Sequence, residues 1–251
     1  MPPTLPRCGN GIHNLMSAAI FLQVRLYSSR LPGKALFPLG DCTVIEHAMR
    51  ALGSLAVDRR MLLTTEDSLK ELTPLAKRAG WDVFTGPIDD VLARYVFASR
   101  KLGIARVMRA TGDNPLVSAI MANAALALSR ESDAAYAAYS GMPLGAGVEV
   151  IRVDALEKAF DEARDPYERE HVCPFILRHP DRFHIKISKA PSQYSAPQAR
   201  ITLDTRQDYE FLVNLYDSLY EGDVLDLDRV IPYLRLFTWN QNDGIQVSHA
   251  G

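Results

Sequence analysis

The chain has 251 residues, nearly equal numbers of acidic and basic side chains, and a formal net charge of -2. One α/β core of this length buries about three quarters of the unfolded surface, so a second domain is not required. Balanced charge offers no basic surface that would hold a polynucleotide by counterion release, which argues against nucleic acid as a partner.

Two further features of composition bear on location. The three cysteines, Cys8, Cys42 and Cys173, are too few and too far apart for a zinc site or a disulfide scaffold, which indicates the cytoplasm. The longest apolar run, residues 18–24, is much shorter than the roughly 20 residues of a spanning helix. We therefore expect no membrane association.

Along the chain, short apolar runs alternate with longer amphipathic segments. Residues 1–15 carry prolines and glycines without an apolar period, so we expect a disordered extension before a single domain of residues 16–251. Continuous apolar runs predict buried strands at residues 18–24, 61–64, 82–84, 105–109 and 134–138. Helical spacing predicts helices between them at residues 43–55, 67–79, 88–102 and 116–128. This alternation predicts an α/β fold, a mostly parallel twisted sheet with helices on both faces.

The alternation of strands and helices changes after residues 148–153, and we expect residues near 165–200 to form a small excursion from the main sheet. The remaining segments predict a helix at 154–164, a strand at 200–203, and final helices at 207–221 and 227–237. Ligands of such a sheet bind beyond the carboxyl ends of its strands, so the loops after Val24 and Arg109 are candidate sites.

The loop after the first predicted strand is rich in groups that bind phosphate. It contains cations, hydroxyls and a glycine within about ten residues: Arg25, Ser28, Ser29, Arg30, Gly33 and Lys34. The P-loop pattern fails here, since no glycine lies five residues before Gly33 and Ala35 follows Lys34. A solvated basic loop is the alternative interpretation.

Two aspartates are candidate ligands for Mg²⁺, which binds one or two carboxylates and fills its other positions with phosphate and water. Asp113 follows Gly112 after the fourth predicted strand, and Asp204 ends the predicted strand at residues 200–203. The alternative role for Asp113 is to cap the next helix. We expect Asp208 one turn inside a helix, where the helix dipole favours an acid.

The segment of residues 165–172 is charged at nearly every position, which is typical of a solvated helix face. Neither His171 nor Cys173 has a visible partner for nucleophilic catalysis, and no Gly-x-Ser-x-Gly turn is present. Hydrolase chemistry therefore has no support in the sequence.

Together these segments resemble the cytidylyltransferases of the spore-coat polysaccharide group, which are similar to the synthetases that attach CMP to sialic acids and to 3-deoxy-manno-octulosonate. The resemblance is carried, in family order, by residues 23–25, 28–34, 90–95, 109–115, 147–150, 168–172 and 203–205, with Asp208. It implies a nucleotide-diphospho-sugar transferase-like fold, Mg²⁺ as cofactor, CTP and a small acidic acceptor as substrates, and a homodimer.

The resemblance also implies roles for individual residues. The implied nucleotide ligands are Arg25, Ser28, Ser29, Arg30, Lys34 and Thr111. The implied metal ligands are Asp113 and Asp204, which with Arg25 and Lys34 would carry catalysis. Arg109, Glu149, Arg169 and His171 would bind the acceptor, although Arg169 and His171 could instead contact a partner subunit. Residues 63–66 lack the Ala-Thr-Ser segment of the family's base pocket, and Val24, Tyr27 and Cys173 replace its alanine, glycine and threonine.

Two rival interpretations remain. A glycosyltransferase would use a similar sheet, but its Asp-x-Asp motif could only be Asp226 and Asp228, between the predicted C-terminal helices. A catalytically silent nucleotide-binding subunit is the other, and the presence of Lys34, Asp113 and Asp204 argues against it.

Overall fold

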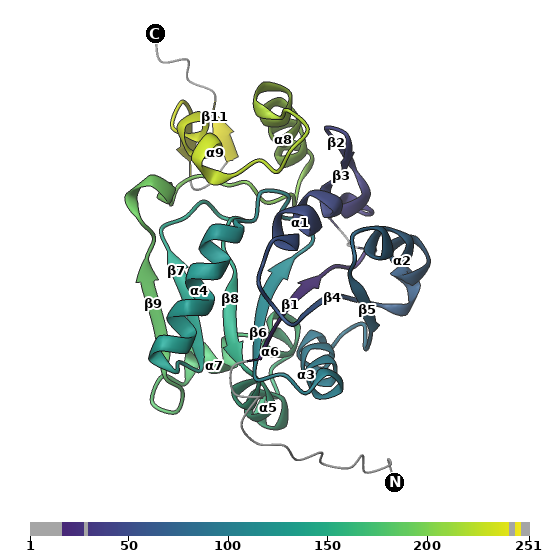
Figure 1. The fold of residues 1–251 in the computed structure, drawn as a ribbon, viewed down its shortest axis with the longest axis vertical. Helices are drawn as coiled ribbons and strands as arrows, with labels where there is room; N and C mark the ends of the chain where they lie inside the picture. Colours follow the sequence, from purple (N-terminus) through teal and green to yellow (C-terminus); the bar gives the residue numbers. More distant parts are fainter. Residues whose placement is uncertain (1–16, 28–29, 241–243, 247–251) are drawn as a thin grey trace.

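The computed structural model describes residues 17–27, 30–240 and 244–246. The expected N-terminal extension and the candidate phosphate ligands Ser28 and Ser29 lie outside these residues. The centre of the molecule is a seven-stranded sheet with the order β5-β4-β1-β6-β8-β7-β9 (Figure 1). Its strands are β1 (Ala18–Gln23), β4 (Arg59–Thr64), β5 (Asp82–Thr85), β6 (Arg106–Thr111), β7 (Tyr136–Ser140), β8 (Glu149–Arg152) and β9 (Ile185–Lys189).

The sheet is mostly parallel, as predicted. Strands β5, β4, β1 and β6 run parallel to one another, and β9 runs parallel to β7. Strand β8 is the exception, because it is antiparallel to both β6 and β7. Two small hairpins lie outside this sheet, formed by β2 (Pro38–Leu39) with β3 (Cys42–Thr43) and by β10 (Thr238–Asn240) with β11 (Gly244–Gln246).

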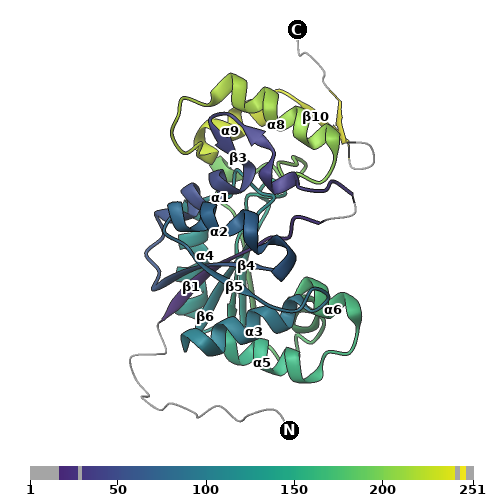
Figure 2. The ribbon, with the colours of Figure 1, turned by 90° about the vertical axis from the view of Figure 1, so that its right-hand side faces the viewer.

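Helices cover both faces of the sheet (Figure 2). One face carries α1 (Val44–Gly53), α2 (Leu69–Arg78) and α4 (Ala119–Ser132), and the other carries α3 (Val91–Leu102), α5 (Val153–Glu162), α6 (Pro166–His171) and α7 (Pro174–Arg178). Strand β1 is buried on both sides, since Ile20 and Leu22 pack into the first core while Ala19 and Phe21 pack into the second. Its continuous apolar sequence follows from this double burial.

A third apolar core lies beyond the carboxyl ends of the strands. It contains α8 (Arg206–Leu219) and α9 (Leu227–Leu234), which sit above the sheet beside the β2–β3 hairpin (Figures 1 and 2). Leu116 and Met121 join this core from the segment that follows β6. The C-terminal helices therefore pack over the edge where ligands of a parallel sheet bind.

The structure lacks one predicted strand, and its main sheet contains a strand that was not predicted. Residues 200–203 do not form a strand; Arg200 makes an isolated parallel bridge with Leu144, and the next residues are extended coil. Their apolar side chains were misleading because Ile201 and Leu203 are buried in the third core, not in the sheet. Strand β9 was missed because it is a partly exposed edge strand with alternating lysines, so the predicted excursion contains one strand of the main sheet.

Within the described part of the chain, no helix combines the length and apolar character needed to span a bilayer.

Candidate functional site

The loop after β1 turns back on itself at Gly33. Its backbone N–H donates to the carbonyl oxygen of Leu26 at 2.7 Å, and its φ of 71° is a left-handed value that glycine adopts without strain. A short 3₁₀ helix, η1 (Lys34–Leu36), begins at the next residue. The turn therefore places the Lys34 side chain at the carboxyl edge of the sheet.

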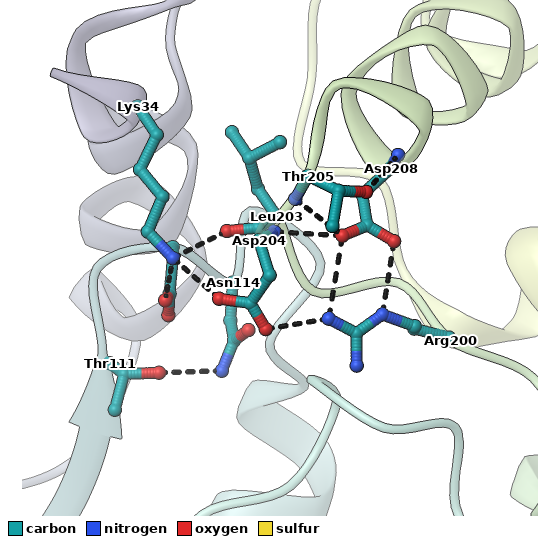
Figure 3. Close-up of polar contacts among 9 residues, drawn as sticks. Lys34, Thr111, Asn114, Arg200, Leu203, Asp204, Thr205 and Asp208 are labelled. Atoms are coloured by element: carbon teal, nitrogen blue, oxygen red, sulfur yellow. Dashed lines mark hydrogen bonds and ion pairs between the residues drawn. The ribbon is translucent and has the colours of Figure 1, made fainter. Parts of the chain in front are cut away.

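Lys34 lies between the two predicted metal ligands, and Figure 3 shows its contacts with Asp204 and Leu203. Its ammonium nitrogen is 2.7 Å from Asp113 Oδ2 and 2.7 Å from Asp204 Oδ1, and it also donates to the Leu203 carbonyl at 2.6 Å. Its side chain is 13% exposed. Since one nitrogen contacts both carboxylates, the two distant aspartates meet in one site, as the sequence predicted.

Asp113 is positioned by the end of β6. Gly112 donates its N–H to the Gln23 carbonyl of β1 at 2.8 Å, and a Cβ at Gly112 would lie 2.9 Å from the Cβ of Val24. Only glycine allows this close approach, which fixes the next residue against β1. The helix-cap interpretation of Asp113 is wrong, because α4 begins later and its cap is Ser118, which accepts from Met121 N–H.

Asp204 is positioned by two charged neighbours rather than by a strand. Its Oδ2 accepts from Arg200 at 2.6 Å, and its backbone N–H donates to Asp208 Oδ2 at 2.9 Å. Asp208 also pairs with Arg200 at 3.0 Å and forms a capping box with Thr205 at the start of α8. Burial acts to raise the pKa of Asp204, but the hydrogen bonds and positive charges of Lys34 and Arg200 outweigh it and hold the pKa below its usual value.

The donor set at this position suits Mg²⁺. Asp113 and Asp204 offer carboxylate oxygens, which are the ligands that this hard cation prefers. Asp113 Oδ1 is buried and has no hydrogen-bond partner among the described residues. A buried carboxylate oxygen without a partner is costly, which is consistent with a position that accepts a cation when the site is loaded.

The other candidate phosphate ligands lie around this centre. Arg25 is about half-exposed and pairs with Glu170 of α6 at 3.4 Å, while Arg30 is exposed. Thr111 accepts from Asn114 Nδ2 at 2.8 Å at the end of β6. Among the described residues, no hydrogen bond or ion pair joins these three side chains to Lys34, Asp113 or Asp204.

Beside the cluster is a cavity of about 430 Å³ at the carboxyl ends of β6 and β7. Arg109 and Glu149, predicted to bind the acceptor, both line it and pair across β6 and β8. Tyr136 also lines it and donates its hydroxyl to Glu149 at 2.7 Å. Burial acts to lower the pKa of Arg109, but the adjacent Glu149 carboxylate outweighs it and raises that pKa.

Two other predicted acceptor ligands lie elsewhere. Arg169 pairs with Asp90 at 2.8 Å, donates to the Phe160 carbonyl at 2.6 Å and does not line the cavity. His171 is exposed and packs against the Tyr167 ring at a centroid distance of 4.3 Å. The structure therefore brings Arg109 and Glu149 together but leaves Arg169 and His171 apart from them.

Another cavity, of about 690 Å³, lies at the opposite edge of the sheet. Arg106 and Arg152 line it, and both pair with Asp133. We place the candidate site at the smaller of these two cavities because it lies at the strand carboxyl ends, where Thr111 and Asn114, close to Asp113 in the sequence, line it. The Asp-x-Asp candidate lies at neither place, since Asp226 and Asp228 begin α9.

Sequence reasoning missed Arg200, Tyr136 and the role of Asp208. Arg200 stands four residues before Asp204, and that spacing could have suggested the ion pair. Tyr136 had no such signal, because only the antiparallel insertion of β8 brings it beside Glu149.

Comparison with known proteins agrees with this geometry. The sequence family described as cytidylyltransferase matches residues 19–230. The spore coat polysaccharide biosynthesis protein SpsF of Bacillus subtilis is 30% identical over 222 residues, covering 85% of this chain and 92% of its own. A cytidylyltransferase structure from Leptospira borgpetersenii superposes with a TM-score of 0.79 at 27% identity, covering 88% of this chain and 94% of its own.

A more distant structure shares the fold. CMP:2-keto-3-deoxy-manno-octonic acid synthetase complexed with CTP gives a TM-score of 0.65 at 16% identity, covering 80% of this chain and 99% of its own. The family match covers Lys34, both aspartates and the residues that line the cavity. The chain thus belongs to the cytidylyltransferase family and is a nucleotidyltransferase.

Proposed function

We propose that this protein transfers the cytidylyl group of CTP to an acidic sugar or phosphonate acceptor, with Mg²⁺ as cofactor, and releases pyrophosphate. The observation that carries this proposal is the meeting of Asp113 and Asp204 at Lys34, at the carboxyl edge of the sheet. The family match and the similarity to SpsF support CTP and a sugar acceptor.

In the proposed reaction, an acceptor oxygen attacks the α-phosphorus of CTP. A new oxygen–phosphorus bond forms, the bond from the α-phosphorus to the bridging oxygen breaks, and the acceptor proton is released. Such a transfer depends on in-line positioning and charge neutralisation rather than on a covalent enzyme intermediate.

The residues of the site have separate tasks in this scheme. Asp113 and Asp204 hold Mg²⁺, which when bound neutralises charge on the reacting phosphate. Lys34, Arg25 and Arg30 offset the negative charge of the triphosphate and of the departing pyrophosphate, with Thr111 and the hydroxyls of Ser28 and Ser29 as further phosphate ligands. We predict all of these contacts from the family pattern and the position of the loop.

The acceptor is proposed to occupy the cavity at Arg109 and Glu149. Glu149 accepts hydrogen bonds from both Arg109 and Tyr136, so it fixes the orientation of a guanidinium and a phenol at the cavity wall. A fixed guanidinium suits a carboxylate or phosphonate, because its planar N–H groups match the oxygens of such anions. A homodimeric state and a cytoplasmic location complete the proposal.

The test is a pyrophosphate-release assay with CTP, Mg²⁺ and a panel of sugar acids and phosphonates. We expect release with at least one acceptor, and a loss of about 100-fold or more in kcat for Asp113→Ala and Asp204→Ala, because the cation loses half its protein ligands. Thermal unfolding should stay within a few degrees of the wild type.

Asp226→Ala is the matched control, since it removes an exposed carboxylate of the Asp-x-Asp segment at the start of α9. It should release pyrophosphate at the wild-type rate. A wild-type rate in Asp113→Ala or Asp204→Ala would remove that residue from the mechanism, and inactivity of the wild type with CTP and every acceptor would contradict the proposal.

A further inference from the structure

The Lys34 ammonium is fully engaged by protein acceptors. An ammonium group has three N–H donors, and three acceptors surround this one at 2.6–2.7 Å: two carboxylate oxygens and the Leu203 carbonyl (Figure 3). No N–H remains for a phosphate oxygen. The family pattern assigns Lys34 to the triphosphate, but here Lys34 binds the predicted metal ligands Asp113 and Asp204 instead.

The same contacts restrict cation binding. Asp113 Oδ2 and Asp204 Oδ1 accept from Lys34, and Asp204 Oδ2 accepts from Arg200. A divalent ion shared by the two aspartates would compete with the Lys34 ammonium for these oxygens. Two cations only a few ångströms apart also repel each other, and that repulsion is weakly screened at a site of low exposure.

Of the two cations in the cluster, Lys34 is the one whose two carboxylate partners are both predicted metal ligands. Arg200 is held by a second carboxylate, Asp208, at 3.0 Å, so it stays when Asp204 changes partner. Lys34 has a flexible four-carbon stem and starts a 3₁₀ helix of only three residues. If the Lys34 ammonium moved away, it would lose its pairing with both carboxylates unless another anion replaced them.

We propose that Lys34 is a resident counter-ion that blocks the metal site until a nucleoside triphosphate arrives. The triphosphate supplies new hydrogen-bond acceptors for the Lys34 ammonium. When the ammonium leaves Asp113 and Asp204, these carboxylates can bind the divalent ion. Metal and nucleotide then bind cooperatively, each raising the affinity for the other. This inference rests on the proposed function and adds a binding order to it.

The experiment measures Mn²⁺ binding by electron paramagnetic resonance, in which free Mn²⁺ gives the signal. Without nucleotide, we expect Lys34→Met to bind Mn²⁺ about tenfold or more tightly than the wild type, because the competing cation is gone. Lys70→Met removes an exposed lysine on α2 and is the control for net charge, so it should match the wild type.

CTP supplies the second half of the test. In the wild type, CTP should raise Mn²⁺ affinity about tenfold or more, and Lys34→Met should show a smaller increase together with weaker CTP binding. Lys34→Met should thus raise the affinity for Mn²⁺ and lower the affinity for CTP. A general loss of structure would lower both affinities. The double variant Lys34→Met, Asp113→Asn should lose the increase in Mn²⁺ affinity that Lys34→Met shows. This result would assign the increase to this site.

Three results would overturn the inference. The first is tight Mn²⁺ binding by the wild type without nucleotide, and the second is equal Mn²⁺ affinity of Lys34→Met and the wild type. The third is an increase in Mn²⁺ affinity that remains when Asp113→Asn is added to Lys34→Met. If Lys34→Met does not fold, as judged by circular dichroism, Lys34→Gln gives the same comparison. Pyrophosphate release with unaltered Mn²⁺ affinity in the variant overturns this inference alone. Failure of the wild type to bind CTP overturns the proposed function as well.

Discussion

Asp208 serves the site without lying at its centre. It is buried and accepts hydrogen bonds from Arg200 and from the backbone N–H groups of Asp204 and Thr205. The sequence predicted its place in the first turn of α8 and the favourable helix dipole there. The hydrogen bond between Asp208 and the backbone of Asp204 could not be predicted in the same way, because it depends on the path of residues 200–205 before the helix.

We expect Asp208→Ala to lower the free energy of unfolding by about 1–3 kcal/mol, since Arg200 and two backbone donors lose their acceptor. Turnover should fall as well, because Asp204 is no longer held. Urea unfolding and the pyrophosphate assay measure the two effects. Asp217→Ala, an exposed change on the same helix, should alter neither; equal effects of both substitutions would contradict this role for Asp208.

At the scale of elements, α6 connects parts of the chain that are distant in sequence. Glu168 pairs with Arg178 of α7, Arg169 with Asp90 at the N-cap of α3, and Glu170 with Arg25 after β1. The charge run that predicted a solvated face is therefore largely a set of ion pairs between elements. Opposite charges on separate elements cannot be matched from the sequence alone, because the fold decides which of them meet.

Arg169→Ala tests whether this residue positions α6 or binds the acceptor. The Arg169–Asp90 pair is partly buried, so its loss should lower stability by about 1 kcal/mol. The acceptor KM should stay within about twofold, because Arg169 does not line the cavity. Asp90→Ala is the matched partner, and the double variant should be less destabilised than the sum of the single changes. An acceptor KM raised about tenfold at unchanged stability would instead support acceptor binding.

Prediction of the elements succeeded where the signal was local. Strands such as β1 and β4 are buried on both faces, and their continuous apolar sequences indicate this directly. It failed where pairing depends on distant residues, as in the antiparallel insertion of β8 and the exposed edge of β9. Asp204 was correctly placed near Asp113 although its predicted strand does not exist, because coil and strand alike bring it past the end of β6.

At the scale of the whole molecule, His47 links the main sheet layer to the C-terminal core. It lies on α1, donates from Nε2 to the Leu39 carbonyl at 2.7 Å, and packs edge-on against Tyr216 and Tyr220. Burial is the main cause that lowers its pKa below the ordinary value of 6.5. The folded protein therefore keeps this imidazole neutral at a pH where the unfolded chain would protonate it.

This difference predicts a pH-dependent stability. As pH falls below about 6.5, the unfolded state binds a proton that the folded state does not, so the free energy of unfolding decreases, by at most about 1.4 kcal/mol per pH unit for one proton. Urea titrations between about pH 7.5 and 5.5 measure the slope. His47→Gln should reduce it, whereas His184→Gln, a change at an exposed histidine, should leave it unaltered. An equal slope in His47→Gln would show that other groups cause the effect.

The segment that supplies Asp204 leaves the ribosome after every strand of the main sheet. A nascent chain can therefore complete its sheet and its first carboxylate while the second is still being synthesised. Such an intermediate lacks the Leu203 carbonyl and the Asp204 carboxylate, which are two of the three acceptors of Lys34. The order of synthesis itself therefore delays the complete Lys34–Asp113–Asp204 cluster until the C-terminal helices dock.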